Sequence, residues 1–142
     1  MRKLFVTFLI VSIISGLHAQ VEGVKIYNWS EIKGCNPDTI FGLSLEKLKM
    51  DTIPEELSVF QNLTVLNLGK NKFSELPDFI GEMKNLEVLD LSKNEFSIFP
   101  LPICRLQKLK KLIVNRNKFE SIPDCIKYCE ELEEVDLWDT PI

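Results

Sequence analysis

The chain has 142 residues, which is room for one domain. Its composition, 45% apolar and 27% charged, is that of a soluble globular protein and excludes a disordered or fibrous chain.

The first nineteen residues have the pattern of a secretory signal peptide. Arg2 and Lys3 precede an apolar run over residues 4–17, and Ala19 is a small residue at a plausible cleavage point. A membrane anchor is the alternative, but the run falls short of the about 20 apolar residues that a spanning helix needs. We therefore expect residues 1–19 to be removed and the protein to be exported, to a periplasm or to the extracellular space. We expect no membrane span in the mature chain.

Removal of the signal would change the chemistry that the chain can perform. Without Arg2 and Lys3, 15 basic residues face 21 acidic ones, a formal charge of −6, which disfavours binding to nucleic acids. The only histidine, His18, leaves as well. Histidine is the side chain most used for acid–base chemistry near neutral pH and the commonest metal ligand. We therefore predict a protein with no catalytic site, no metal and no cofactor.

Residues 20–39 differ from the rest of the chain and are interpreted as an N-terminal cap. The segment 28–32 reads as a short helix, with Asn28 or Ser30 as its N-cap residue. Gly34, Asn36 and Pro37 then end it. We expect this cap to cover the first core layer of the segment that follows.

From residue 40 onward the chain repeats every 23 residues, in blocks 40–62, 63–85, 86–108 and 109–131, with a partial block 132–142. Positions 1, 4, 6, 11, 14, 18 and 21 are apolar in all four complete blocks, and a proline follows position 14 each time. The alternation at positions 4 and 6 predicts a short strand with one apolar face. Position 9 is asparagine in three blocks, where a side-chain amide can pair with the backbone of adjacent coils: Asn71, Asn94 and Asn117.

These residues resemble leucine-rich repeats of the LxxLxLxxNxLxxLPxxIxxLxx type, and the resemblance covers roughly residues 40–142. It implies an α/β solenoid, a right-handed curved superhelix with a parallel sheet on its concave face and short helical or 3₁₀ segments on its convex face. A single coil cannot bury its own leucines, so neighbouring coils share one core.

The resemblance places partner binding on the concave strand positions 3, 5 and 7, which we expect to be free of a structural role. The leading prediction is a non-catalytic module that binds a protein or peptide. Trp138 is the best single anchor, although it could instead shield the end of the last coil. The candidate contact residues are Val65, Asn67, Val88, Asp90, Ser92, Lys111, Ile113, Asn115, Asp136 and Trp138.

Position 8 predicts a basic ridge where the strands end. The ridge could steer an acidic or sulfated partner, or it could be a row of solvated side chains that keeps the protein soluble. Its members are Lys47, Lys70, Lys93 and Arg116.

The cysteines allow at most one internal disulfide. Cys35 lies too many coils away, whereas Cys104 could pair with Cys125 or Cys129 in the next coil. Cys129 occupies an apolar position and is expected to act as a small buried hydrophobe.

Two further functions are weighed against the binding module. One is a structural component that assembles through its uncovered C-terminal coil. The other is a targeting segment of an enzyme, for which no residues remain in this sequence. Six acids near the last strand would oppose each other across an end-to-end interface, so we predict a monomer: Glu130, Glu131, Glu133, Glu134, Asp136 and Asp139.

The signal assignment predicts that natively expressed protein starts at Gln20 or a neighbouring residue. Intact-mass measurement checks this directly. Cytosolic protein that still carries Met1–Ala19 would contradict the export prediction.

Overall fold

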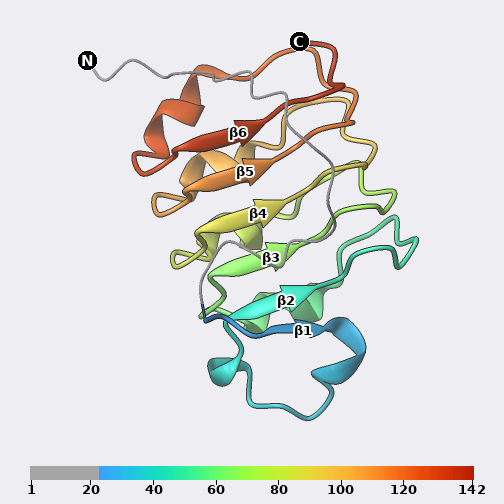
Figure 1. Cartoon of the computed structure of the whole chain (residues 1–142), viewed down its shortest axis with the longest axis vertical. Helices are drawn as coiled ribbons and strands as arrows, with labels where there is room; N and C mark the ends of the chain where they lie inside the picture. The colour runs from blue at the N-terminus through green and yellow to red at the C-terminus, as the bar shows by residue number, and fades with distance from the viewer. Residues whose placement is uncertain (1–22) are drawn as a thin grey trace.

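The computed structural model describes residues 23–142, so the predicted signal peptide Met1–Ala19 lies outside the described residues. The coils stack along one axis, and their strands form a single parallel sheet in chain order (Figure 1). The strands are β1 (Ile26–Asn28), β2 (Gly42–Ser44), β3 (Val65–Asn67), β4 (Val88–Asp90), β5 (Lys111–Ile113) and β6 (Glu134–Asp136).

Each complete coil returns to the next strand through a 3₁₀ helix on the face opposite the sheet, which we call the return face (Figure 1). The predicted solenoid of parallel strands and short 3₁₀ segments is therefore confirmed. The 3₁₀ helices are η1 (Trp29–Glu31), η2 (Pro37–Thr39), η3 (Glu55–Val59), η4 (Asp78–Glu82), η5 (Leu101–Arg105) and η6 (Asp124–Tyr128).

The core consists of side chains that repeat from coil to coil. Strand pairing places residues 23 apart opposite each other, so Leu66 pairs with Leu89 and Leu89 with Leu112. All three are fully buried, and the phenylalanine at position 11 of three coils joins the same core: Phe73, Phe96 and Phe119. Because each leucine is covered by its counterparts in adjacent coils, burial depends on stacking rather than on any single coil.

The asparagine at position 9 joins two coils through its amide group. The amide nitrogen of Asn94 donates to the Leu68 carbonyl of the preceding coil at 3.0 Å and to two carbonyls of its own coil. Its oxygen accepts the Phe73 backbone N–H at 3.0 Å. Asn71 and Asn117 make the same set of bonds. These buried amides satisfy backbone groups at the turn that no strand ladder reaches.

The first and last coils depart from this pattern. Leu48 occupies the asparagine position of the first coil and is 46% exposed. In the last coil the Thr140 hydroxyl donates to the Val114 carbonyl at 3.3 Å, the bond that an asparagine amide makes elsewhere. Threonine thus supplies the donor half of the asparagine bridge.

The N-terminal segment contains a strand that the sequence pattern did not predict. Besides the short helix, which is η1 and begins after Asn28 as expected, β1 pairs in parallel with β2. The pairing requires Gly42, because a Cβ there would lie 2.5 Å from the Ile26 side chain and 2.8 Å from the Lys25 carbonyl. Trp29 then packs edge-on against Phe60, with ring centroids 6.4 Å apart. A three-residue strand outside the repeat has no periodicity by which the sequence could reveal it.

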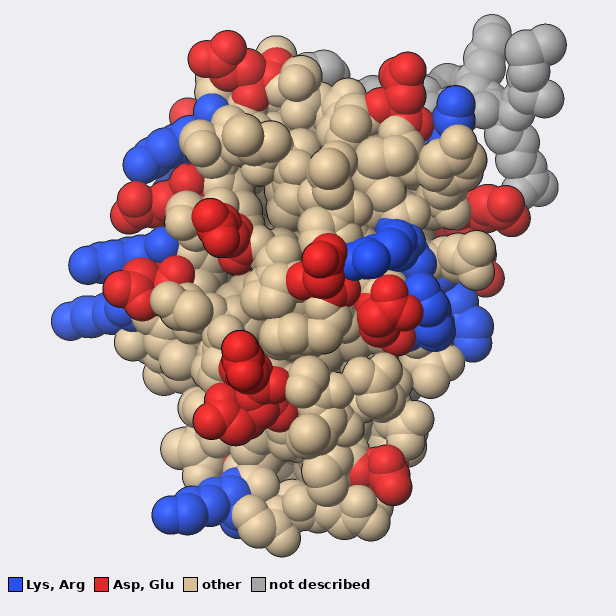
Figure 2. All heavy atoms as spheres, turned by 180° about the vertical axis from the view of Figure 1, so that it is seen from behind, with Lys and Arg blue, Asp and Glu red and all other residues tan. Residues whose placement is uncertain are grey.

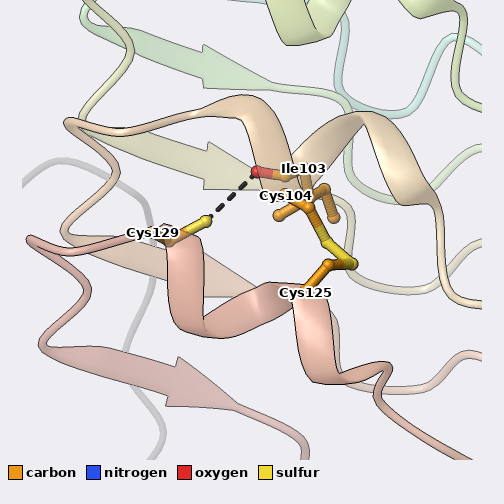
Figure 3. Close-up of a disulfide and its surroundings, with 4 residues drawn as sticks. All are labelled: Ile103, Cys104, Cys125 and Cys129. Atoms are coloured by element: carbon orange, nitrogen blue, oxygen red, sulfur yellow. Dashed lines mark hydrogen bonds between the residues drawn. A yellow bond between two sulfur atoms is a disulfide. The ribbon is translucent and has the colours of Figure 1, made fainter.

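One disulfide links two adjacent return segments, as Figure 3 shows: Cys104 of η5 is bonded to Cys125 of η6. Of the two pairings that the sequence left open, the structure therefore has Cys104 with Cys125. Cys129 is a free, buried thiol that donates to the Ile103 carbonyl at 3.2 Å. Burial raises the pKa of the Cys129 thiol, which keeps it protonated and inert as a core side chain.

We predict that Asn94→Ala lowers the free energy of unfolding by about 1–3 kcal/mol, because the buried backbone groups that it serves lose their partners. Lys93→Ala is the matched control. Lys93 is exposed and adopts a positive φ of 53°, and alanine meets the same backbone cost there, so the change should stay below about 0.5 kcal/mol. Equal losses in denaturant melts would contradict the structural role of the amide.

Candidate binding site on the sheet face

Position 5 side chains on the sheet face have a structural role, which corrects our expectation that they are free of one. Each polar member accepts the backbone N–H of the residue two places further along. Asn67 accepts from Gly69 at 2.9 Å, and Asp90 accepts from Ser92 at 2.8 Å. These bonds end the strands as Asx turns do. Ser44 and Asp136 do the same for Glu46 and Trp138.

Burial divides the predicted contact residues into two groups. Those on β3, β4 and the residues just after them are buried: Val65, Asn67, Val88, Asp90 and Ser92. Those on β5, β6 and the residues just after them are half-buried or exposed: Lys111, Ile113, Asn115, Asp136 and Trp138. The second group is the accessible part of the predicted site.

The accessible group surrounds an apolar side chain. Ile113 takes the place where other coils have a polar acceptor, and it is only half-buried. On one side Lys111 pairs with Glu134 at 2.9 Å, and on the other the Asn115 amide donates to the Asp136 carboxylate. These polar pairs cross from one strand to the next and hold the border of the apolar spot in place.

Trp138 lies at the same end of the sheet face and is 62% exposed. The Arg116 guanidinium sits over its ring, 4.5 Å from the centroid, and also approaches the Asp139 carboxylate at 3.4 Å. A stacked guanidinium restrains both side chains. Trp138 is therefore a large aromatic surface that is already positioned and largely accessible.

The four residues of the basic ridge share an unusual backbone conformation. All four residues have positive φ values between 53° and 62°, a conformation that costs a residue with a Cβ about 1–2 kcal/mol. Acids also line the ridge, since Lys70 pairs with Glu46 at 2.6 Å and Arg116 with Asp139. These pairs reduce the positive field that the ridge could offer to an acidic partner. Binding by Lys47, Lys70, Lys93 and Arg116 stays a prediction.

Among residues 23–142 no group of three or more acidic, histidine or cysteine side chains could hold a metal ion. No helix in this range is long and apolar enough to cross a membrane.

Sequence reasoning missed one exposed feature of the return face. Ile98 and Leu101 are 77% and 60% exposed, yet neither occupies a core position of the repeat. The signal was present in the alignment of the blocks, because the other complete coils have polar residues at both positions.

Comparison with known proteins supports the fold and its class. The family described as "Leucine-rich repeat region" matches residues 42–141, so the chain belongs to the leucine-rich repeat family. No curated protein matches the sequence.

Many solved structures are similar to it, among them three leucine-rich repeat proteins. A leucine-rich repeat protein of Leptospira interrogans is 27% identical with a TM-score of 0.62, over 82% of this chain and 36% of that one. The ectodomain of the Arabidopsis thaliana receptor kinase GASSHO1/SCHENGEN3, solved in complex with CASPARIAN STRIP INTEGRITY FACTOR 2, is 35% identical with a TM-score of 0.56, over 71% and 12%. The ectodomain of the Arabidopsis thaliana receptor kinase SOBIR1 is 27% identical with a TM-score of 0.61, over 74% and 61%. The chain thus spans less than two thirds of each of these proteins.

Asp90, one of the position 5 residues, makes the stability of the protein depend on pH. Burial raises the pKa of the Asp90 carboxyl, and nearby Glu46 adds to this, while the bonds from Ser92 and the charge of Lys70 oppose it. A carboxyl whose pKa is raised by folding destabilises the folded protein when ionised, so the penalty grows as the pH rises above the ordinary value of about 4. Asp90→Asn keeps the acceptor, as Asn67 shows, and should raise stability at pH 7 by on the order of 1 kcal/mol.

The reverse exchange at the equivalent position of the preceding coil, Asn67→Asp, is the control and should lower stability at pH 7. Both differences should shrink as the pH falls toward about 4, where the carboxyls are protonated. Thermal melts across this range measure them. A loss of stability in Asp90→Asn at neutral pH would show that the ionised carboxylate is favoured instead.

Proposed function

We propose that this protein is a non-catalytic module that binds a protein or peptide through the C-terminal end of its sheet face. The observation that carries the proposal is the exposed Trp138, with Arg116 over its ring, at the same end of the sheet face as the half-buried Ile113. Binding energy at protein interfaces is concentrated in such aromatic and arginine side chains, and a restrained aromatic loses little entropy when a partner covers it.

Similarity to receptor ectodomains supports the proposal, since that of GASSHO1/SCHENGEN3 was solved in complex with CASPARIAN STRIP INTEGRITY FACTOR 2. The disulfide between Cys104 and Cys125 supports an exported location, because disulfides persist in oxidising compartments outside the cytosol. An assembly role through the last coil is the alternative, and it predicts self-association instead of capture of a different partner.

We expect a double variant, Ile113→Asn with Trp138→Ser, to lose its partner while keeping its fold. Both new residues already occupy the equivalent positions in other coils, as Asn67 and Ser92. Asparagine at 113 would also supply an acceptor for the Asn115 N–H, the bond that polar residues make elsewhere at position 5. Affinity capture from the native envelope or medium, followed by mass spectrometry, measures the loss.

Tyr128→Glu is the matched control, because Tyr128 is a 59% exposed aromatic on the return face and Glu82 occupies the equivalent position. It should leave capture intact. Capture lost in Tyr128→Glu but kept in the double variant would place the interface on the return face. Self-association that the double variant abolishes would favour the assembly role.

A further inference from the structure

An exposed apolar pair on the return face breaks the repeat pattern. Ile98 is at position 13 and Leu101 at position 16, and their side chains are 77% and 60% exposed. Neither contributes to the core that the repeat builds, so the fold does not require an apolar residue at either place. The equivalent residues in the other complete coils are polar: Thr52, Glu75 and Ser121 at position 13, and Glu55, Asp78 and Asp124 at position 16.

Acidic side chains border this pair on both sides. Because coils stack with equivalent positions adjacent, Glu75 lies in the coil before Ile98, and Glu120 and Asp124 lie in the coil after it. All three are exposed, and within residues 23–142 none forms an ion pair. Acidic side chains lie across this face; most lysines and arginines lie toward its edges, and one basic group lies further in, against acidic neighbours (Figure 2). The surface is therefore an apolar centre with a negative border.

The segments that carry the pair are held rigidly. Arg105 of η5 donates to the Asp78 carbonyl and carboxylate of η4, both at 2.8 Å. It crosses directly over Gly81, where a Cβ would lie 2.5 Å from the guanidinium group. On the other side the Cys104–Cys125 disulfide ties η5 to η6. A surface braced from both sides loses little conformational freedom on binding.

A shallow depression lies between the first two complete coils, on the side of η4 away from the coil that carries the pair. Phe79 and Pro77 line it from η4 and the residue before it, and Ile53 lines it from the preceding coil. Three polar residues of the preceding coil line it as well: Thr52, Glu55 and Ser58. Because η4 and η5 pack side by side, the depression lies one coil away from the Ile98–Leu101 pair.

We infer that this part of the return face is a second docking surface, for a peptide segment whose apolar side chains are flanked by lysine or arginine. Leucine-sized side chains of such a segment bury Ile98 and Leu101, and its cations meet Glu75, Glu120 and Asp124. A second copy of this chain fits poorly, because its acidic border would oppose the same border. The surface lies on the opposite face from the site proposed above and does not depend on it.

Fluorescence anisotropy with the purified full chain tests the inference. The probe is a labelled synthetic peptide of alternating leucine and lysine, compared with a lysine–serine and a leucine–glutamate peptide of the same length. The chain should bind the leucine–lysine peptide more tightly than either comparison peptide, with an affinity that falls as salt is added.

The decisive variant is Ile98→Ser with Leu101→Asp, which gives both positions the residues of neighbouring coils, Ser121 and Asp78, and so preserves the fold. The variant adds a negative charge, so purely electrostatic attraction would tighten its binding of the leucine–lysine peptide. Apolar contact instead predicts that this affinity falls about tenfold or more. A second variant, Glu75→Gln with Asp124→Asn, should weaken binding and flatten its salt dependence. The control Ile113→Asn with Trp138→Ser should bind as the parent chain does.

Three results would overturn the inference. One is equal binding by the parent chain and the Ile98→Ser, Leu101→Asp variant. Another is no preference for the leucine–lysine peptide over the other two. The third is concentration-dependent self-association in sedimentation that this variant removes, which would identify a second copy as the occupant.

Discussion

A coil of this protein cannot satisfy its own backbone or bury its own leucines, and the asparagine amide at position 9 resolves the first of these problems. Asn94 donates to a carbonyl of the coil before it and accepts an N–H of that same coil, so each amide bridges two turns. The spacing that these bonds and the strand ladder impose brings equivalent side chains into register. Core packing, the position 5 turns and both surface faces follow from that register.

The two faces use this register differently. On the sheet face, Asn67 and Asp90 close the turns after their strands, so their polar groups are occupied within the protein. Where Ile113 replaces the acceptor and Trp138 follows the last strand, the face offers apolar surface to a partner. On the return face the accessible apolar surface comes from Ile98 and Leu101, which replace polar residues of the repeat. In both places a departure from the repeat, rather than the repeat itself, marks the candidate contact.

Covalent and electrostatic cross-links are concentrated in the coils that carry these departures. The Cys104–Cys125 bond and the Arg105–Asp78 contacts join three successive return segments. The Arg116–Trp138 stack and the Asn115–Asp136 bond join the last two coils at the sheet face. In a solenoid each coil contacts only its neighbours. Such links therefore restrain the coils that they join and have little effect on the more distant ones.

The sequence by itself determined the solenoid, its repeat length, the core columns and the role of the asparagines, because a 23-residue period repeats each signal several times. It also reduced the disulfide to two pairings. Tertiary structure decided what occurs only once or depends on neighbours across coils. In the folded chain Cys104 bonds to Cys125 and not to Cys129. Strand β1 pairs with β2, where Gly42 leaves room for it. The tertiary structure also showed that position 5 side chains bond to their own backbone, a choice between turn geometry and solvent that the sequence pattern does not encode.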